Sequence, residues 1–404
     1  IRLTALQQTA ASTYPTITAA PGKLRLARLL LYNGPHCFAL CSDLPAMSYF
    51  RADIDAMNGY TPGYQPQGKG YVKLNTNENP YPPSERVIEA LREAAGPNLR
   101  KYPDPVCGAF REAAAEVLGT APQRVLCGNG SDDLLNIALR SFCAEGDAVV
   151  FPWPTYSLYP VLARIQGARA LRIDFPEDYS LPPDLASTGA PLTLLCNPNA
   201  PSGTLIPPEE VSGLADALDG VLLVDEAYVD FADANCLGLV DMHENVVVTR
   251  SLSKSYALAG LRFGYAVAQE HLIEGMMKVK DSYNVDGPAI AGATAAILDQ
   301  AWLERTVGKI RKTRQHLTTE LERIGLRCRP SQTNFVLARV PAPLDAAWVQ
   351  EQLFERKVLV RYFDQPRLDD CLRITVGSPT DTDALLEALE EIITAAQATG
   401  DPDR

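Results

Sequence analysis

One lysine with phosphate-binding neighbours is the stretch of this sequence best suited to chemistry. Lys254 lies just past an apolar run, is flanked by Ser251 and Ser253, and is followed eight residues later by Arg262. A lysine held in a partly buried position beside cations loses its proton more readily and can attack an aldehyde as a neutral amine. The hydroxyls and the guanidinium can bind a phosphate. Taken alone, this stretch also fits a strand-to-loop turn with an ordinary surface lysine.

Short apolar runs recur through the middle of the chain, each followed by a polar or glycine-containing segment. We predict these runs to be strands at 124–127, 148–151, 192–195, 221–224 and 246–248. They are apolar throughout, which is typical of parallel strands buried on both faces. Ligands of open α/β sheets bind beyond the carboxyl ends of the strands. The unusual polar residues follow those ends, so we expect the site there.

The expected fold class is α/β, with a three-layer αβα large domain around a mostly parallel sheet and a smaller C-terminal α/β domain. We predict an N-terminal arm at 47–74, a large domain at 75–289 and a small domain at 290–404, because isolated strands and helices alternate after about residue 290. Helices are expected at 85–95, 111–118, 133–142, 272–282, 288–298, 304–324 and 381–396. Further strands are expected at 71–74, 266–268, 334–338, 358–360 and 372–376.

Residues 1–46 differ from the rest of the chain. They hold four basic residues and only Asp43 as an acid, and the first methionine is Met47. We interpret them as an upstream extension that is disordered or non-native and not part of the folded protein. A secretory signal is the alternative, because 24–32 is basic and then apolar, but this run is interrupted early by Asn33, Gly34 and Pro35.

Composition argues against several classes of protein. The formal charge of -12 and the lack of a Lys/Arg-rich run argue against a nucleic-acid partner. No apolar stretch reaches the roughly 18 residues of a membrane span. Cysteines inside apolar runs, such as Cys127, Cys143 and Cys196, fit reduced thiols of a cytoplasmic protein, and the scattered histidines give no ligand spacing, so no metal is expected.

The strand ends offer each group that a pyridoxal phosphate site needs. Gly130, Ser131 and Asp132 open a helix, where free backbone N–H groups and the helix dipole favour a phosphate. Asp225 follows a buried strand, and a carboxylate there requires a cation such as a protonated pyridine nitrogen. A helix cap and a structural salt bridge are the alternative interpretations of these two features.

Three further side chains complete the cofactor site. Asn199 and Tyr228 can both donate a hydrogen bond to the phenolic oxygen of the cofactor, and Tyr156 can stack on its ring. Either tyrosine, considered singly, also fits a core or rim aromatic.

An ordered set of motifs from about Tyr60 to Ala396 resembles the histidinol-phosphate aminotransferase family, which belongs to the class-II aminotransferases of fold type I. The motifs, in chain order, are Asn75-Thr76-Asn77-Glu78-Asn79-Pro80, Tyr102-Pro103-Asp104, Gly128-Asn129-Gly130-Ser131-Asp132, Pro154-Thr155-Tyr156, Asn197-Pro198-Asn199-Ala200-Pro201-Ser202-Gly203, Asp225-Glu226-Ala227-Tyr228, Ser253 to Arg262, and Leu372 to Gly377. The family's order and spacing make the whole set far more specific than any one motif.

The resemblance implies a role for each residue. Lys254 would carry the cofactor as a Schiff base, and Asp225 would pair with the pyridine nitrogen. Asn199 and Tyr228 would hold the ring hydroxyl by hydrogen bonds. The phosphate would be bound by Ser131, Asp132, Ser251, Ser253 and Arg262. Tyr102 would reach the cofactor phosphate of a neighbouring subunit, which implies a homodimer with shared active sites.

The resemblance also implies the substrates. Arg373 matches the arginine that binds the carboxylate of glutamate, and with Arg361 and Tyr60 it would bind the phosphate of histidinol phosphate. The implied reaction is transamination between histidinol phosphate and 2-oxoglutarate in histidine biosynthesis. A surface charge or a strand-end salt bridge is the alternative for each arginine.

Four alternative functions share parts of this pattern. An aromatic aminotransferase and a phosphothreonine decarboxylase use nearly the same cofactor residues. An ATPase would use the run 222–226 as a Walker B strand, although the glycine-rich segment 63–70 lacks the final Ser or Thr of a P-loop. A cofactor-binding module of a transcription regulator would need a DNA-binding domain, for which residues 1–46 are too short and irregular.

Overall fold

The computed structural model describes residues 48–399, and the chain divides after Asp55 into two compact units. The described part of the first unit contains the short helix α1 (Ala52–Asp55). The second unit, from Ala56 onward, contains all other elements. The predicted extension at 1–46 lies outside the described residues.

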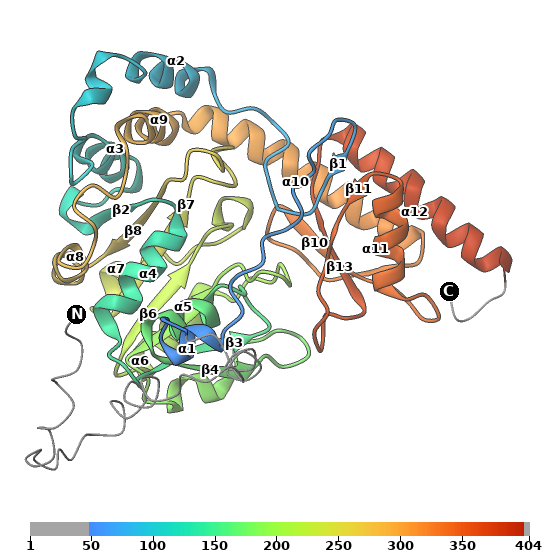
Figure 1. Ribbon diagram of the computed structural model, residues 1–404, viewed down its shortest axis with the longest axis horizontal. Helices are drawn as coiled ribbons and strands as arrows, with labels where there is room; N and C mark the ends of the chain where they lie inside the picture. The colour runs from blue at the N-terminus through green and yellow to red at the C-terminus, as the bar shows by residue number, and fades with distance from the viewer. Residues whose placement is uncertain (1–47, 400–404) are drawn as a thin grey trace, which may run out of the picture. The chain divides into compact units, whose positions relative to one another are not determined.

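A seven-stranded sheet is the largest sheet of the second unit and lies on the left in Figure 1. Its strands lie in the order β2 (Val125–Gly128), β8 (Gly264–Ala268), β7 (Val246–Ser251), β6 (Val221–Asp225), β5 (Leu192–Cys196), β3 (Ala148–Trp153) and β4 (Arg169–Asp174). From β7 to β4 all neighbours are parallel, whereas β8 runs antiparallel to both β2 and β7. The expected mostly parallel sheet is therefore confirmed.

Most strands of the large sheet are buried along nearly their whole length. Every residue of β2, β5 and β8 is buried, and β6 is buried from Leu222 to Asp225. Successive side chains of a strand point to opposite faces, so this pattern requires cover on both faces of the sheet. The edge strand β4 is mostly exposed instead.

Helices supply this cover and the connections. Those before and around the sheet are α2 (Glu85–Ala94), α3 (Gly108–Leu118), α4 (Ser131–Phe142), α5 (Tyr159–Gln166), α6 (Pro208–Ala217), α7 (Leu239–Met242), α8 (Glu270–Met277) and α9 (Gly287–Leu298), with the 3₁₀ turns η1 (Pro97–Arg100), η2 (Pro122–Arg124), η3 (Pro183–Ser187) and η4 (Val229–Phe231). Ser84 caps α2 as predicted, with its hydroxyl accepting from the Val87 N–H. The small residues of α9 let it pack closely against α2 and α3.

A second, antiparallel sheet follows the long helix α10 (Gln300–Arg323). Its order is β12 (Arg361–Tyr362), β13 (Cys371–Thr375), β10 (Phe335–Arg339) and β9 (Arg327–Cys328), and it is accompanied by α11 (Ala346–Glu355) and α12 (Pro379–Thr399). Arg361 and Arg373 are direct partners in the β12–β13 register. Directly opposed residues of an antiparallel pair project from the same face.

The segment before the large sheet is attached to this C-terminal region. β1 (Val72–Lys73) pairs in parallel with β11 (Val358–Leu359). The Leu74 N–H donates to the Leu359 carbonyl at 2.8 Å, and the Thr375 N–H donates to the Leu74 carbonyl at 2.9 Å. Residues about 300 apart in sequence are thereby placed side by side.

The predicted boundaries hold within a few residues for most elements. The helix expected at 272–282 was wrong in its extent, because α8 begins at Glu270 and ends at Met277. The strand expected at 266–268 is confirmed but begins earlier, at Gly264, and is part of the central sheet. No helix of the described residues 48–399 is long and apolar enough to cross a bilayer.

Candidate active site

A cavity of about 210 Å³ lies at the carboxyl ends of the strands of the large sheet. It collects side chains from the segment before α2, from several strand ends and from the C-terminal sheet. The sequence-predicted residues that line it are Tyr60, Ser131, Asp132, Tyr156, Asp225, Tyr228, Ser251, Ser253, Lys254, Arg262, Arg361 and Arg373. The expected convergence of the strand ends on one cavity is therefore observed.

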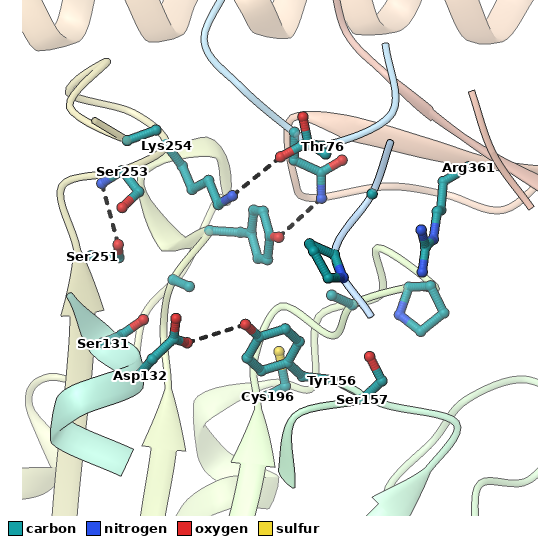
Figure 2. Close-up of a pocket in the computed structure, with 18 of the residues that line it drawn as sticks. Thr76, Ser131, Asp132, Tyr156, Ser157, Cys196, Ser251, Ser253, Lys254 and Arg361 are labelled. Carbon is teal, nitrogen blue, oxygen red and sulfur yellow. Dashed lines mark hydrogen bonds between the residues drawn. The ribbon is translucent and has the colours of Figure 1, made fainter. Parts of the chain in front are cut away.

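Lys254 lies three residues beyond β7 and points into this cavity (Figure 2). Its Nζ donates to the Thr76 carbonyl at 3.4 Å and lies 5.7 Å from the centre of the Tyr228 ring. Burial, and then the positive charge of Arg373, lower the pKa of Lys254 to about 8. A substantial fraction of this amine is therefore neutral near physiological pH, as a nucleophile toward an aldehyde must be.

Asp225 ends β6 and is 2 % exposed. Its Oδ2 accepts a hydrogen bond from the Tyr159 hydroxyl at 2.9 Å, and the Thr249 hydroxyl lies 3.5 Å from Oδ1. Among residues 48–399 it has no ion-pair partner within 4.0 Å. Burial raises the pKa of Asp225 to about 6 despite the Tyr159 hydrogen bond. A buried carboxylate of this kind fits a cationic ligand group, such as a protonated pyridine nitrogen.

The next residue, Glu226, is held by the protein itself. Its carboxylate pairs with Arg250 at 2.8 Å and also accepts from the Cys236 N–H. The Glu226 carboxylate and the Arg250 guanidinium are largely buried, and each is occupied by this ion pair. Glu226 is thus unavailable for the nucleotide chemistry that the Walker B interpretation of 222–226 would need.

A phosphate-sized region is formed at the amino end of α4. Gly130 has φ +82°, and a Cβ there would meet the Arg262 guanidinium at 2.5 Å. A Cβ on Gly264 would lie 2.6 Å from the Ser131 N. These glycines let Arg262 and strand β8 approach the helix terminus, where unpaired backbone N–H groups favour an anion.

Arg262 is oriented toward this region by two side chains. Its Nη1 donates to the Ser253 hydroxyl at 3.3 Å, and its Nη2 donates to the Asp132 carboxylate at 3.2 Å. The Ser253 N–H donates in turn to the Ser251 hydroxyl at 3.2 Å. A guanidinium, two hydroxyls and a helix amino terminus therefore fit a phosphate group here.

Tyr156 lines the cavity between this region and the C-terminal sheet (Figure 2). Its hydroxyl donates to the Asp132 carboxylate at 3.1 Å, and the Tyr60 ring meets its ring edge-on at 6.2 Å between centroids. Burial, and then the charge of Asp132, raise the pKa of Tyr156, so it remains a neutral aromatic. Its ring is available for packing against a flat ligand.

The two register partners Arg361 and Arg373 make the far side of the cavity positive. The Arg373 guanidinium lies over the rings of Phe335 and Phe363, at 5.3 and 5.4 Å, and its Nη2 donates to the Asn75 carbonyl at 3.1 Å. Burial lowers the pKa of Arg373. Its Nε is buried and, among residues 48–399, has no hydrogen-bond partner. An anionic ligand group would satisfy this donor.

Three predicted residues do not line the cavity, as far as residues 48–399 define it: Gly130, Asn199 and Tyr102. The Asn199 amide donates to the Pro154 carbonyl at 3.2 Å and to the Ser202 hydroxyl at 2.8 Å. Its side chain therefore fixes the neighbouring loop in this structure. Tyr102 is 81 % exposed and stacks on Tyr283 with ring centroids 4.5 Å apart.

Sequence reasoning assigned no role to three residues that the structure brings to the site. Asn77 donates to the Tyr228 hydroxyl at 2.9 Å, the Thr76 carbonyl accepts from Lys254, and Tyr159 donates to Asp225. Burial raises the pKa of Tyr228 to about 12. Asn77 belongs to the motif at 75–80, whereas Tyr159 has no sequence signal except its position three residues after Tyr156.

The fold and this constellation define an aminotransferase. Residues 69–391 match the family described as Aminotransferase class I and II, and the chain belongs to this family.

Curated relatives are more specific. The chain is 44 % identical over 348 residues to "Histidinol-phosphate aminotransferase 1" of Trichormus variabilis, covering 86 % of this chain and 99 % of the relative. It is 45 % identical to "Histidinol-phosphate aminotransferase" of Rhodopirellula baltica over 84 % of this chain and 95 % of that protein.

A solved structure is also similar. It is the histidinol-phosphate aminotransferase of Sinorhizobium meliloti in complex with pyridoxal-5'-phosphate, with 29 % identity and a TM-score of 0.79. The similarity covers 87 % of this chain and 99 % of that one. The expected fold type I architecture is confirmed by this match.

Proposed function

We propose that this chain is a histidinol-phosphate transaminase that uses pyridoxal phosphate. It transfers the amino group of L-histidinol phosphate to 2-oxoglutarate and yields imidazole acetol phosphate and glutamate, a step of histidine biosynthesis. The observation that carries the proposal is that Lys254, Asp225 and the paired Arg361 and Arg373 converge on one cavity, while Asp225 has no counter-cation in the described part of the chain. The family and the names of the curated relatives support the same reaction.

The residues present fit the cofactor. Asp225 would pair with its ring nitrogen, and Arg262, Ser251, Ser253 and the amino end of α4 would bind its phosphate. Tyr156 would pack on its ring. When bound, pyridoxal phosphate supplies an aldehyde for exchange of amines and an electron-accepting ring.

Lys254 is the group placed to move the proton. With a pKa of about 8, its amine is readily interconverted between the neutral and charged forms at Nζ. The Thr76 carbonyl accepts from this Nζ at 3.4 Å and limits its direction. Proton transfer by one positioned group typically contributes about 10²- to 10⁴-fold to the rate.

Arg361 and Arg373 would bind the acidic end of either substrate. A guanidinium presents two parallel N–H donors that match a phosphate or a carboxylate. Histidinol phosphate and 2-oxoglutarate both carry such a group, so one arginine pair can serve both half-reactions. Tyr60 lines the same side of the cavity and would limit the size of the donor.

We further propose that the active unit is a homodimer in which Tyr102 reaches the cofactor phosphate of the partner subunit. The high exposure of this aromatic in the single chain supports a role outside its own subunit. The sequence further predicts a large domain at 75–289 that binds pyridoxal phosphate and a small domain at 290–404. A cytoplasmic location is also a prediction from the sequence.

A donor screen tests the function. Purified protein is incubated with pyridoxal phosphate, 2-oxoglutarate and one of histidinol phosphate, phenylalanine or phosphothreonine. Formation of glutamate should be fastest with histidinol phosphate. A faster reaction with phenylalanine would reassign the enzyme to aromatic substrates, and release of CO₂ from phosphothreonine without 2-oxoglutarate would overturn transamination.

Replacement of the nucleophile tests the assigned chemistry. Lys254→Ala should lose both glutamate formation and the visible absorbance of the lysine-bound cofactor. Lys312→Ala, which removes an exposed lysine of α10, is the matched control and should retain both. Activity retained in Lys254→Ala would refute the role of this lysine.

A further inference from the structure

A second pocket shares no lining residue with the active-site cavity. Its volume is about 360 Å³, compared with about 210 Å³ for the active-site cavity. It lies between the residues that follow β4 and the strands β9, β10 and β13. The residues that line it are Glu177, Tyr179, Arg327, Cys328, Arg329, Leu337, Arg339, Arg367 and Cys371. A volume of this size suits a small molecule.

The lining of this pocket is strongly positive for a chain of net charge -12. It contains four arginines and a single acid, Glu177. Asp370 outside the lining compensates Arg339 through an ion pair of 2.9 Å. The remaining excess of positive charge is concentrated in a small concave region, where it favours anions.

The arginines of the pocket fall into two groups. Arg367 donates to the carbonyls of Trp153, Phe175 and Pro176 at 3.2, 2.7 and 3.1 Å, so its role is to hold backbone segments together. Arg339 is occupied by Asp370. The guanidinium groups of Arg327 and Arg329, in contrast, have no hydrogen-bond acceptor or ion-pair partner anywhere in the described part of the chain.

Tyr179 is a second, independent indication of a ligand. It is only 4 % exposed, yet within residues 48–399 its hydroxyl has no hydrogen-bond partner. Arg329 and Arg367 lie over its ring, at 4.7 and 5.4 Å from the centroid. Because Tyr179 lines the pocket and its hydroxyl has no acceptor among residues 48–399, this hydroxyl is available to donate a hydrogen bond to an oxyanion in the pocket.

We propose that this pocket binds a small oxyanion with two or more negative charges, held by Arg327, Arg329 and the hydroxyl of Tyr179. A phosphate monoester and a tricarboxylate present the same acceptor oxygens to guanidinium groups, and they are the two sources to be distinguished. The site is separate from the arginine pair of the active site, and it goes beyond the proposed function.

Isothermal titration calorimetry of the cofactor-loaded enzyme tests the site. The Arg361→Gln/Arg373→Gln double variant is used first, because it removes the anion-binding arginines of the active site. We expect it to bind glycerol 3-phosphate or citrate saturably. Adding Arg329→Gln should weaken this binding about tenfold or more, because a charge-assisted hydrogen bond is lost.

Two further variants separate the site from general charge effects. Tyr179→Phe removes only the hydroxyl and should weaken binding several-fold. Arg305→Gln removes an exposed arginine of α10 that does not line the pocket, and it should leave the affinity unchanged. Circular dichroism and thermal unfolding establish that each variant is folded.

Each outcome bears on the proposal. Tighter binding of glycerol 3-phosphate assigns a phosphate ligand, and tighter binding of citrate assigns a carboxylate ligand. The proposal is overturned if neither probe binds saturably, or if Arg329→Gln leaves the affinity unchanged. If the double variant does not fold, the same titration in the otherwise unaltered enzyme decides, because Arg329→Gln must then weaken one binding event about tenfold or more and leave the active-site event unchanged.

Discussion

Asp225 and Glu226 are neighbours in the sequence and are both buried, but within residues 48–399 only Glu226 has a cationic partner. Glu226 pairs with Arg250 at 2.8 Å, whereas the side-chain partners of Asp225 are the hydroxyls of Tyr159 and Thr249. At this strand end the Glu226 carboxylate stabilises the fold, whereas the Asp225 carboxylate is available to a ligand in the cavity. Replacing each carboxylate by the neutral amide should therefore have opposite effects on the stability of the fold.

Asp225→Asn should leave the stability of the cofactor-free protein at pH 7 unchanged or raised, because it removes a buried charge without a counter-cation. Transamination should fall by about a hundredfold or more. Glu226→Gln should lower the free energy of unfolding by about 3–5 kcal/mol, because Arg250 is left buried and unpaired. Urea unfolding and glutamate formation measure both effects. Equal loss of stability in the two variants would contradict this division.

Cofactor capture by the cofactor-free protein should depend on pH with a midpoint near 8. Only the neutral amine of Lys254 attacks an aldehyde, so the rate of appearance of the visible absorbance should rise as pH increases through the pKa of about 8. Arg373→Gln removes a nearby positive charge, which raises the pKa of Lys254 and should move the midpoint to higher pH. Arg361→Gln is the matched control, and an equal shift in both variants would argue against the specific effect of Arg373.

Tyr159→Phe should destabilise the cofactor-free protein in a pH-dependent way. The Asp225 pKa is raised by burial from 3.8 to about 6, so its charged form opposes folding increasingly as pH rises through this interval. Loss of the Tyr159 hydrogen bond raises this pKa further. The stability deficit of the variant should therefore be small up to about pH 6, where Asp225 is protonated in both folded proteins, and should grow to about 1–3 kcal/mol as pH rises above 6 through the higher pKa of the variant.

The matched control for this experiment is Tyr256→Phe. The Tyr256 hydroxyl accepts from the Gln300 amide at 3.1 Å and, among residues 48–399, has no hydrogen bond to a carboxylate. Its loss should change the thermal midpoint by a similar amount from pH 4 to pH 8. If the stability of Tyr159→Phe depends on pH in the same way as that of this control, Tyr159 does not stabilise the charged form of Asp225.

Arg361→Gln should weaken binding of the phosphorylated donor more than it slows the chemical step. Each charge-assisted hydrogen bond contributes about 1.5–3 kcal/mol, so KM for histidinol phosphate should rise about 10- to 100-fold. Arg361→Lys should recover only part of this loss, because an ammonium lacks the two parallel donors of a guanidinium. Steady-state kinetics test this expectation. The control is Arg356→Gln, because Arg356 lies outside the cavity.

Mixed dimers test the proposed sharing of active sites. Chains carrying Tyr102→Phe are mixed with chains carrying Lys254→Ala, under conditions that allow exchange of subunits. If Tyr102 acts on the partner's cofactor, the mixed dimer has one site with an intact lysine beside an intact tyrosine, and activity should exceed the mean of the two parent variants. Activity equal to this mean would indicate that each chain uses its own tyrosine.

The inner part of the fold was predictable because its strands are continuous apolar runs. Residues 192–195 and 221–224 became β5 and β6 with one added residue each. Strand β4 had no such signal, because it is an exposed edge strand with the polar sequence RALRID. Its pairing with β3 is set by the neighbouring strand and not by its own composition.

The site was predictable where a residue type and a strand end coincide, as for Asp225 and Lys254. The contacts of Asn77 and Tyr159 were not, because a hydrogen bond between residues 66 or 151 positions apart depends on how the elements pack. The second pocket had no sequence signal at all: its arginines become neighbours only through the pairing of β9 with β10 and the position of Tyr179.

The attachment of the early segment to the last strands has a consequence for synthesis of the chain. Leu74 and Asn77 obtain their partners from Leu359 and Thr375, so this wall of the cavity cannot form while the ribosome is still adding the residues before β13. The large sheet can fold earlier, since all its strands precede residue 269. A newly made chain should therefore become able to retain a ligand only near the end of translation.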